Sequence, residues 1–389
     1  MSPVSHVLIV GAGIAGSASA IALASIGIRV TLIEKQPIWR FQSSGIFVYG
    51  NGLQALRSLG VLPQIVEAGF TIPDGRNVYL DHQGAPIVDT FYPSPGAGIP
   101  SILGIKRAEM HRVLATRLAD LGVDAQLDTT IEYLHAPSDG SQVMVRLSDG
   151  REQFFDLVIG ADGIRSQVRQ MLWPSVKPRY TGFGVWRSVH PRPAGLNTKI
   201  MLMGLRKRLG IMPISQERLY LFGTVMEAAD SWFARERWPE IMAQRFADFG
   251  GPVRPFLDAL SPDSDVLYTA VEEVALPTPW HQGRVLLIGD AAHASTPFLG
   301  QGGAMAIEDG VVLAQMLKDA NHPVEQLLQR FSERRYSLCS FVQEASRRVG
   351  EVGTREYAGE DLNLRNAGMR QNAQKQVDDF YREMAALQG

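Results

Sequence analysis

Cysteine is nearly absent from this sequence of 389 residues, in which Cys339 is the only one. A single cysteine excludes a disulfide framework and a cluster of thiolate metal ligands, and it fits a reducing compartment. The eight histidines form neither an HExxH motif nor another spacing typical of metal ligands. We therefore expect no metal site.

Charge of one sign and long hydrophobic runs are scarce as well. The formal net charge is −2 and no run of Lys or Arg stands out, which argues against nucleic acid or a membrane surface as a partner. No apolar run reaches the roughly 18 residues that a membrane-spanning helix needs. The N-terminal stretch MSPVSHVLIVGAGIAG lacks the basic region of a signal peptide. We expect a soluble cytoplasmic protein.

The sequence does contain a series of short apolar runs, each typical of a strand buried on both faces of a parallel sheet. A helix of small residues that stops at Gly27 follows the first run, and apolar residues recur at helical spacing between residues 106 and 121. This pattern predicts a doubly wound α/β domain. The runs are Val7–Val10, Arg29–Ile33, Phe155–Ile159 and Val285–Ile288.

The pattern changes between about residues 173 and 277, where we predict an inserted mixed β-sheet. The stretches KIMLMGL, RLGIMPI and RLYLFGTV read as strands separated by polar turns. Beyond about residue 320 the chain is charged and has a helical period, which predicts a helical C-terminus. A chain of this length is expected to form two domains.

The first motif that carries chemistry is Gly11-x-Gly13-x-x-Gly16, followed by Glu34 at the end of the second predicted strand. Gly11 permits a tight turn, Gly13 lets the backbone approach a pyrophosphate, and Gly16 allows close packing of helix and strand. The helix N-terminus offers its N–H groups to the anion, and Glu34 would accept hydrogen bonds from a ribose. This context predicts a dinucleotide, and it leaves both NAD and FAD open.

Two further motifs follow later strands. Residues 160–169, GADGIRSQVR, place an acid, glycines and arginines before a helix, a pattern that is equally typical of an ordinary turn. Residues 289–303, GDAAHASTPFLGQGG, follow the last apolar run and open another helix. Side-chain packing does not require Gly300, Gly302 and Gly303, so we infer that a large ligand approaches the backbone there.

Together, in this order and spacing, the three motifs resemble those of the single-component (group A) FAD-dependent aromatic monooxygenases, the family of salicylate, p-hydroxybenzoate and urate hydroxylases. The resemblance covers roughly residues 5–320. It implies a Rossmann-like FAD-binding domain formed by residues 1–72, 100–172 and 278–320, with a mixed-sheet substrate domain formed by residues 73–99 and 173–277. Residues 321–389 would form a C-terminal helical segment.

The resemblance also implies roles for individual residues. Asp162 would link the FAD region to the path of the pyridine nucleotide, and Arg165 and Arg169 are candidates for NAD(P)H contacts. Asp290 would bind the ribityl and ribose hydroxyls near the pyrophosphate. The nucleotide half of FAD would lie on or beside a larger set of residues, namely Gly11, Gly13, Ile14, Ala15, Gly16, Glu34, Lys35, Arg107 and Ile131.

The third motif would hold the flavin ring. Gly300, Gly302 and Gly303 would let the backbone meet the edge of the isoalloxazine, with the positive end of the following helix directed at its N1/C2=O locus. Pro297 would line the flavin face near the substrate. His293 is interpreted as a structural residue that caps the turn rather than as a proton carrier.

For the substrate, the resemblance to urate hydroxylases points to Arg208 and Tyr220, which lie on predicted strands joined by a polar turn. An antiparallel pair would bring both onto one face, where a cation and a phenol suit an anionic phenolate or azole. The alternative is that each packs with its polar tip in solvent. Arg187 and Tyr49 are further candidates for the pocket, and Trp186 is expected in the core.

The implied reaction has two halves. NAD(P)H reduces FAD, and dioxygen then forms a C4a-hydroperoxyflavin that hydroxylates an electron-rich aromatic or heteroaromatic ring. The protein would act as a monomer or a homodimer. A flavin halogenase would carry a Trp-x-Trp-x-Ile stretch, which is absent. A flavin-dependent prenyl-chain reductase and a non-enzymatic escort protein with the same fold stay open as alternatives.

Overall fold

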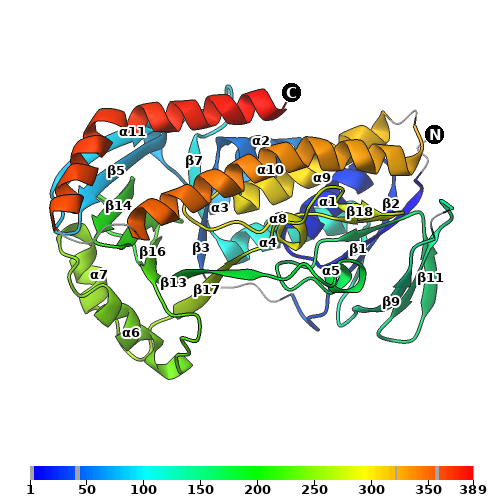
Figure 1. Cartoon of the computed structure of the whole chain (residues 1–389), viewed down its shortest axis with the longest axis horizontal. Coiled ribbons are helices and arrows are strands. Elements are labelled where there is room, and N and C mark those ends of the chain that lie inside the picture. The colour runs from blue at the N-terminus through cyan, green and yellow to red at the C-terminus, as the bar shows by residue number, and fades with distance from the viewer. Residues whose placement is uncertain (1–3, 40–43, 138, 320–321, 355–358, 389) are drawn as a thin grey trace.

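A computed structural model describes residues 4–39, 44–137, 139–319, 322–354 and 359–388. Figure 1 shows an α/β half and a second β-rich half, with a long helix, α10 (Val324–Thr354), running across both. A further long helix, α11 (Gly359–Gln388), covers the β-rich half. Across the described residues, we find no helix of the length and apolar character needed to span a membrane.

The α/β half is built on a six-stranded sheet in the order β18-β19-β12-β1-β2-β8. Neighbouring strands are parallel except for β18, which pairs antiparallel with β19. The strands are β1 (His6–Val10), β2 (Arg29–Ile33), β8 (Asp124–Gln126), β12 (Leu157–Gly160), β18 (His281–Gln282) and β19 (Val285–Leu287). The predicted doubly wound α/β domain is therefore confirmed.

One predicted strand is wrong at its start. Phe155 belongs to β11 (Glu152–Phe155), which lies in a separate three-stranded sheet with β9 (Ile131–His135) and β10 (Val143–Leu147). The cause is Asp156, whose Oδ2 accepts the backbone N–H groups of Ser5 and His6 at 2.8 and 2.9 Å. This contact ends one strand and sets the register of the next.

The helix after β1, α1 (Ile14–Ser25), packs against α9 (Gly302–Lys318), which begins at the third motif. The packing is close because both helices carry small residues: a Cβ at Gly310 would lie 2.7 Å from Cα of Ser19. The other elements of this half are α2 (Gly50–Ser58), α3 (Leu62–Ala68), α4 (Arg107–Asp120), α5 (Gln167–Leu172), α8 (Asp290–His293), and a small sheet of β3 (Gly45–Tyr49), β4 (Phe70–Thr71) and β7 (Ile102–Lys106).

The second half is a seven-stranded mixed sheet in the order β17-β13-β16-β15-β14-β5-β6. The three predicted strand stretches between residues 199 and 225 form consecutive strands of this sheet. Its strands are β5 (Arg76–Asp81), β6 (Pro86–Phe91), β13 (Arg179–Pro191), β14 (Lys199–Gly204), β15 (Lys207–Pro213), β16 (Arg218–Met226) and β17 (Val266–Glu273).

The two faces of this sheet differ in chemistry because side chains alternate along each strand. The outer face carries Trp186, Leu202, Leu209 and Leu221, which are fully buried against α6 (Trp238–Arg245) and α7 (Arg254–Asp258). Trp186 is thus a core residue, as expected. The inner face turns toward β3 and α10, and it carries Arg187, Lys199, Arg208, Tyr220 and Phe222.

The C-terminal helices are bonded to both halves. Gln343 of α10 donates its amide to the carbonyl oxygens of Val274 and Ala294, at 2.7 and 2.9 Å. Ser346 donates to the carbonyl oxygen of Thr296 at 2.8 Å. The loop that leads to Gly300 is therefore fixed by α10.

Candidate flavin and substrate site

The three sequence motifs meet at one edge of the six-stranded sheet. They follow β1, β12 and β19, which are adjacent parallel strands and therefore end at the same edge. Gly11 has φ +100°, and a Cβ there would lie 2.9 Å from Cα of Asp162. A Cβ at Gly289, with φ +57°, would lie 2.8 Å from Cβ of Ala15. Each motif touches another, so the three form a single site.

The first motif leaves an open position at the N-terminus of α1. A Cβ at Gly13 would meet no atom within 4 Å, whereas one at Gly16 would lie 1.8 Å from the carbonyl oxygen of Gly11. Gly16 is thus required for packing, and Gly13 exposes backbone to a ligand. An open backbone at the start of a helix fits a phosphate.

Glu34 stands at the rim of this loop. Its Oε2 accepts the N–H of Ala12 and its Oε1 accepts the N–H of Gln36, both at 3.0 Å. These bonds hold the carboxylate in place and leave it lone pairs for a ribose. The neighbouring Lys35 is exposed, whereas the side chain of Ile131 is fully buried in the core.

The two carboxylate oxygens of Asp162 have different surroundings. Its Oδ2 accepts the N–H groups of Gln167 and Val168 at 2.6 and 3.1 Å, at the start of α5. Its Oδ1 is buried and has no hydrogen bond within the described part of the chain. Burial raises the pKa of this carboxyl. Buried acceptors are rarely left unpaired, so the Oδ1 fits a ligand donor beside Gly11.

The third motif forms a glycine-lined cradle at the N-terminus of α9. Gly300 has φ +65° and lies against the ring of Phe47. The nearest atoms to a Cβ on Gly302 and Gly303 would be Ser295 Oγ and Ile46 Cδ1, each at 3.3 Å. The N-cap residue of α9 makes no side-chain capping hydrogen bond, and the helix directs its positive end toward this turn. These features fit the edge of a flavin ring.

The cradle lies opposite the inner face of the seven-stranded sheet. Asp290 is exposed and Pro297 is partly exposed in the same motif. Arg107, at the start of α4, is half-buried. Burial and the nearby Arg187 lower its pKa, while Asp290 and Tyr220 act in the opposite sense. Two cations, a carboxylate and a phenol therefore converge between the cradle and the sheet.

The predicted hairpin that carries Arg208 and Tyr220 is confirmed, and both side chains lie on the inner face. The register nevertheless separates them, because Tyr220 pairs with Met212 and Arg208 pairs with Thr224. Four residues of strand correspond to about 13 Å. Arg208 donates to the carbonyl oxygen of Val349 on α10 at 2.8 Å, while Tyr220 stacks on Phe222 with ring centres 5.1 Å apart.

Arg169 was predicted to be a candidate for NAD(P)H contacts, and the structure contradicts this. Its side chain is fully buried, and its guanidinium donates to the carbonyl oxygens of Ala291 and Ile164 at 2.8 and 2.6 Å. The guanidinium N–H groups of Arg169 are thus already bound to backbone carbonyl oxygens and are not available to a nucleotide. Arg165 is exposed and forms an ion pair with Glu272 at 2.5 Å.

His293 has a structural setting, as expected. It is buried, its Nε2 lies 2.7 Å from Asp309 Oδ2, and its ring stacks on Trp280. Burial opposes its charge, but Cys339 and Asp309 outweigh burial and raise the pKa of His293 well above its usual range. Arg335 completes the cluster with ion pairs to Asp309 and Glu308, at 2.7 and 3.0 Å.

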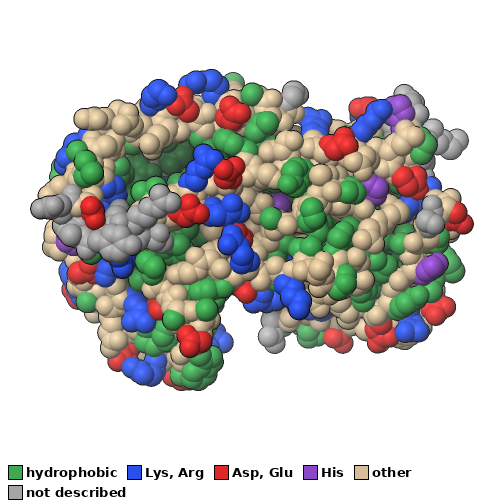
Figure 2. All heavy atoms as spheres, in the orientation of Figure 1, with side chains coloured by type: hydrophobic (Ala, Val, Ile, Leu, Met, Phe, Trp, Pro, Cys, Tyr) green, Lys and Arg blue, Asp and Glu red, His purple; other side chains and the backbone are tan. Residues whose placement is uncertain are grey.

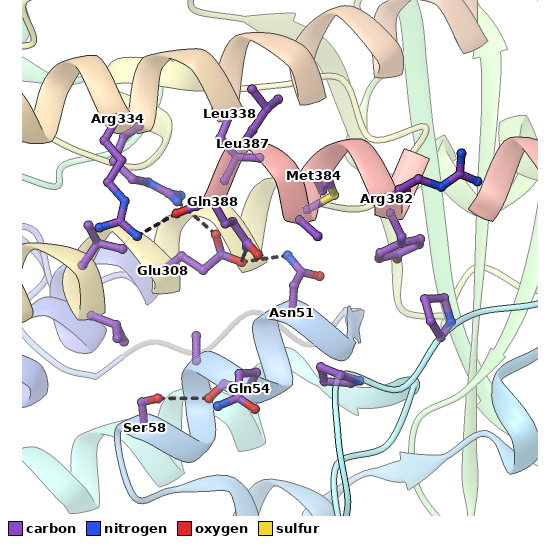
Figure 3. A pocket seen from close by; sticks show the side chains of 18 of the residues that line it. Asn51, Gln54, Ser58, Glu308, Arg334, Leu338, Arg382, Met384, Leu387 and Gln388 are labelled. Atoms are coloured by element: carbon purple, nitrogen blue, oxygen red, sulfur yellow. Dashed lines mark hydrogen bonds and ion pairs between the residues drawn. The ribbon is translucent and has the colours of Figure 1, made fainter. Parts of the chain in front are cut away.

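A cavity of about 690 Å³ lies between α2, α9, α10 and α11 (Figure 3). Asn51 points into it and donates to Gln301 and Glu308, at 3.0 and 2.9 Å. The cavity is lined by later turns of α9 and not by its glycine N-terminus, so it is separate from the cradle. Figure 2 shows a second hollow, lined by hydrophobic side chains, between α11 and the seven-stranded sheet.

Sequence reasoning missed two residues of this region. Lys199 lies on the inner face, 2.9 Å from Tyr49 Oη, and Asn51 binds Gln301 at the start of α9. In the sequence, Lys199 is the first residue of an apolar strand, KIMLMG. A lysine at that position is typical of the exposed end of a strand. Only the register shows that this lysine is buried.

The three glycine-containing turns lie at one edge of a Rossmann-like sheet, and a second sheet faces that edge. This arrangement is typical of an FAD-dependent oxidoreductase. The sequence profile of the family described as "FAD binding domain" matches residues 4–346, and the chain belongs to this family. Within it, the protein is a single-component FAD-dependent monooxygenase of the aromatic hydroxylase type, with FAD as its cofactor.

Named relatives of full length support this assignment. The chain is 34% identical over 357 residues to an aurachin C monooxygenase/isomerase of Stigmatella aurantiaca, covering 90% of each chain. It is also 34% identical over 350 residues to a 2-heptyl-3-hydroxy-4(1H)-quinolone synthase of Pseudomonas aeruginosa, covering 89% of each. These names do not support a prenyl-chain reductase or an escort protein.

The fold is also that of a solved enzyme. Klebsiella pneumoniae HpxO, complexed with FAD and uric acid, superimposes with a TM-score of 0.84 at 23% identity, covering 98% of this chain and 97% of HpxO. At this identity the similarity concerns the fold. It extends over both sheets and the C-terminal helices.

Proposed function

We propose that this monooxygenase hydroxylates a heteroaromatic ring that carries an acidic N–H or O–H group, using NAD(P)H and dioxygen. The observation that carries the proposal is that Arg107, Arg187 and Tyr220 lie close enough to act on one another, with Arg107 also near Asp290 of the third motif. Cations beside a ring stabilise its deprotonated form, and deprotonation makes the ring richer in electrons. Two relatives at 34% identity are named for a quinolone and an aurachin, which supports a heteroaromatic substrate.

The residues that would hold FAD are those that the sequence predicted. Gly11, Gly13, Ile14, Ala15 and Gly16 would receive the pyrophosphate, with Glu34 and Lys35 at the adenosine ribose and Ile131 near the adenine. Asp162 and Asp290 would accept from ligand hydroxyls. Gly300, Gly302 and Gly303 would meet the flavin edge, and Pro297 its face. When bound, FAD supplies hydride acceptance from NAD(P)H and the activation of dioxygen.

The chain's own contribution is position and electrostatics. The inner face of the sheet closes over the cradle, and the half-buried Arg187 and Phe222 reduce contact with water there. Charges in a site of low dielectric act more strongly than in water. Arg208 and Tyr220 are the residues that we expect to contact the substrate, with Arg208 nearer to α10.

The boundaries predicted for the two domains are proposed on the same basis, since β5, β6 and β13–β17 form one sheet. A cytoplasmic location and a monomeric or homodimeric state complete the proposal. The single cysteine, which is buried, supports the former.

The proposal is tested with the purified FAD-loaded protein. NADH and NADPH oxidation is measured with quinolones, hydroxypyridines, purines and phenols, and products are identified by mass spectrometry under ¹⁸O₂. We expect one class of heteroaromatic compound to stimulate oxidation and to gain a single ¹⁸O atom. A flavin that neither nucleotide reduces, or oxidation that yields only hydrogen peroxide with every compound, would overturn the proposal.

A further inference from the structure

Lys199 places a buried amine on the inner face of the seven-stranded sheet. The residue is 4% exposed. Its Nζ donates to Tyr49 Oη at 2.9 Å, and it lies 4.8, 5.3 and 5.4 Å from the ring centres of Phe47, Tyr49 and Tyr92. Within the described part of the chain, no carboxylate lies within ion-pair distance of it. The amine is therefore surrounded by aromatic rings and one phenol.

The register places Lys199 level with Tyr220. Ile200 pairs with Ile211, so Lys199 stands beside Met212, and Met212 pairs with Tyr220 on the following strand. Two strand spacings separate the backbone positions of Lys199 and Tyr220, about 10 Å across the sheet. The buried Met212 stands between Lys199 and Tyr220 on the same face. Arg208 lies four residues further along β15.

Phe47 connects this position to the flavin cradle. Its ring lies 4.8 Å from Lys199 Nζ and 5.1 Å from the ring of Phe222. The same ring touches Gly300, where a Cβ would lie only 2.1 Å from it. One aromatic side chain thus separates the amine from the loop that is expected to meet the isoalloxazine.

Two buried polar side chains lie in the same row of the sheet as Lys199. Lys199 pairs with Asn77, and Asn77 pairs with Thr90, so all three side chains share the inner face. Asn77 and Thr90 are fully buried. The amide atoms of Asn77 and the hydroxyl of Thr90 form no hydrogen bond of ordinary length with the described residues. A row of unpaired polar groups is costly in a dry core and is retained where a ligand completes it.

A buried cation without a counter-ion is costly to fold, since the desolvation penalty is not repaid by a partner. Accordingly, burial lowers the pKa of Lys199 to about 7. The neutral amine is then available near neutral pH as a proton acceptor. The charged form becomes favourable again once an anion lies against it.

We propose that Lys199, with Tyr49, binds the acidic oxygen of the aromatic substrate and accepts its proton. This rests on the proposed function and specifies its substrate as a ring that carries an ionisable hydroxyl. The O–H bond of the substrate breaks, its electron pair stays on the oxygen, and the proton moves to the lone pair of Lys199 Nζ. The products are an oxyanion and an ammonium in contact, and no electron changes hands.

The other titratable groups around Lys199 do not account for a change in ligand binding near pH 7. Tyr49 on β3, Tyr79 on β5, Tyr92 after β6 and Tyr381 on α11 face the same region, and burial raises the pKa of each above the usual range. Arg208 acts on Tyr79 and stays charged. A transition near pH 7 in ligand binding is therefore assigned to Lys199.

The test compares Lys199→Met and Lys199→Arg with Lys207→Met. Lys207 lies on the next strand, and its Nζ binds Asp248 and the carbonyl oxygen of Arg245 on the outer side. The probes are salicylate, 4-hydroxybenzoate, 6-hydroxynicotinate, urate and 4-hydroxyquinoline, each with its methylated analogue. Dissociation constants are read from the flavin spectrum between pH 6 and pH 9.

We expect the native protein to bind at least one acidic probe about 10- to 100-fold more tightly than its methylated analogue. Lys199→Met should abolish this preference and the transition near pH 7, and Lys199→Arg should keep the preference without the transition. Lys207→Met should behave like the native protein. FAD content, measured on every variant, reports correct folding.

Two results would overturn the inference: an unchanged preference in Lys199→Met, or a native protein that binds none of the acidic probes better than its analogue. A failure of the proposed function would already show in the native protein: neither NADH nor NADPH would reduce its flavin. It can therefore be told apart from a failure of the inference about Lys199. If reduction and hydroxylation proceed while Lys199→Met is unaffected, only the assignment to Lys199 is wrong.

Discussion

Arg169 Nη1 donates to the carbonyl oxygen of Ala291 at 2.8 Å, and this bond joins the second motif to the third across 122 residues of chain. The same guanidinium binds the carbonyl oxygens of Ile164 and Val176, at 2.6 and 3.3 Å. The loops around the predicted FAD site therefore hold one another through a buried arginine. This relationship explains why an arginine of the motif is unavailable to a pyridine nucleotide.

Replacing Arg169 should destabilise the fold before it affects chemistry. Arg169→Met leaves buried carbonyl oxygens without donors, at a cost of about 1–3 kcal/mol for each. We expect a lower melting temperature and weaker FAD retention in thermal unfolding followed by flavin fluorescence. Arg165→Met is the control, because Arg165 lies in the same motif with its side chain 62% exposed. Equal melting temperatures for the two variants would contradict this role.

Asp290→Ala should weaken FAD retention. The carboxylate lies at the start of α8, beside the glycine cradle, and we expect it to accept from ligand hydroxyls. Loss of such an acceptor typically costs about 1–3 kcal/mol, or roughly 5- to 150-fold in the dissociation constant of FAD. Titration of the apoprotein with FAD measures this constant. The exposed carboxylate of Asp258 serves as the control, and an unchanged constant in Asp290→Ala would remove this residue from the site.

Asp162→Ala should slow the reduction of the flavin by NAD(P)H more than it lowers FAD content. Its buried Oδ1 has no hydrogen bond to any described residue and lies beside the first motif, while its Oδ2 caps α5. Asp162→Asn, which keeps an acceptor oxygen, should retain more activity. Stopped-flow absorbance at the flavin band gives the rate. Loss of FAD with a normal reduction rate in the remaining holoenzyme would show that Asp162 acts on FAD alone.

Tyr220→Phe and Arg208→Met should impair turnover while FAD stays bound. Truncating a buried polar contact with the substrate costs about 2–4 kcal/mol, or roughly 30- to 1000-fold in kcat/KM. Uncoupling should accompany this, with hydrogen peroxide released from NAD(P)H oxidation. The assay is product formed per NAD(P)H consumed. Native coupling in both variants would assign the pocket to other residues of the inner face.

His190 should make the protein less stable in mild acid. Burial lowers the pKa of His190 to about 4, from 6.5 in the unfolded chain. Below pH 6.5 the unfolded chain therefore binds a proton at His190 that the native state does not bind. The free energy of unfolding consequently falls as the pH drops toward 4. Between pH 7.5 and pH 5 this contributes about 2 kcal/mol. Urea unfolding at both values should show a smaller loss for His190→Gln than for the native protein or for His322→Gln, an exposed control.

The glycine motifs could be predicted from the sequence because their physical requirement is local. Gly11, Gly289 and Gly300 all have positive φ, and the strands before them are short apolar runs that only a parallel sheet buries on both faces. The mixed sheet could also be predicted from the sequence, since its strands are separated by polar turns. The family followed from the order of these motifs along the chain.

The remaining features depend on contacts between distant residues. Arg165 and Arg169 look alike in the sequence, yet one is exposed and the other lies under Ala291. Lys199 is separated by 150 residues from the Tyr49 hydroxyl that it binds. The strand pair β10 and β11 was missed because exposed apolar residues such as Phe154 disturb its alternating pattern. Register and tertiary burial decide all of these cases.

The bonds from α10 to the loop before Gly300 have a consequence for biosynthesis. All three family motifs have been translated by residue 303, but Gln343 and Ser346, which hold Ala294 and Thr296, follow later. Domains generally acquire structure from the N-terminus during synthesis. The flavin loop therefore gains its support only near the end of translation, and a nascent chain with complete motifs still lacks a complete cofactor pocket.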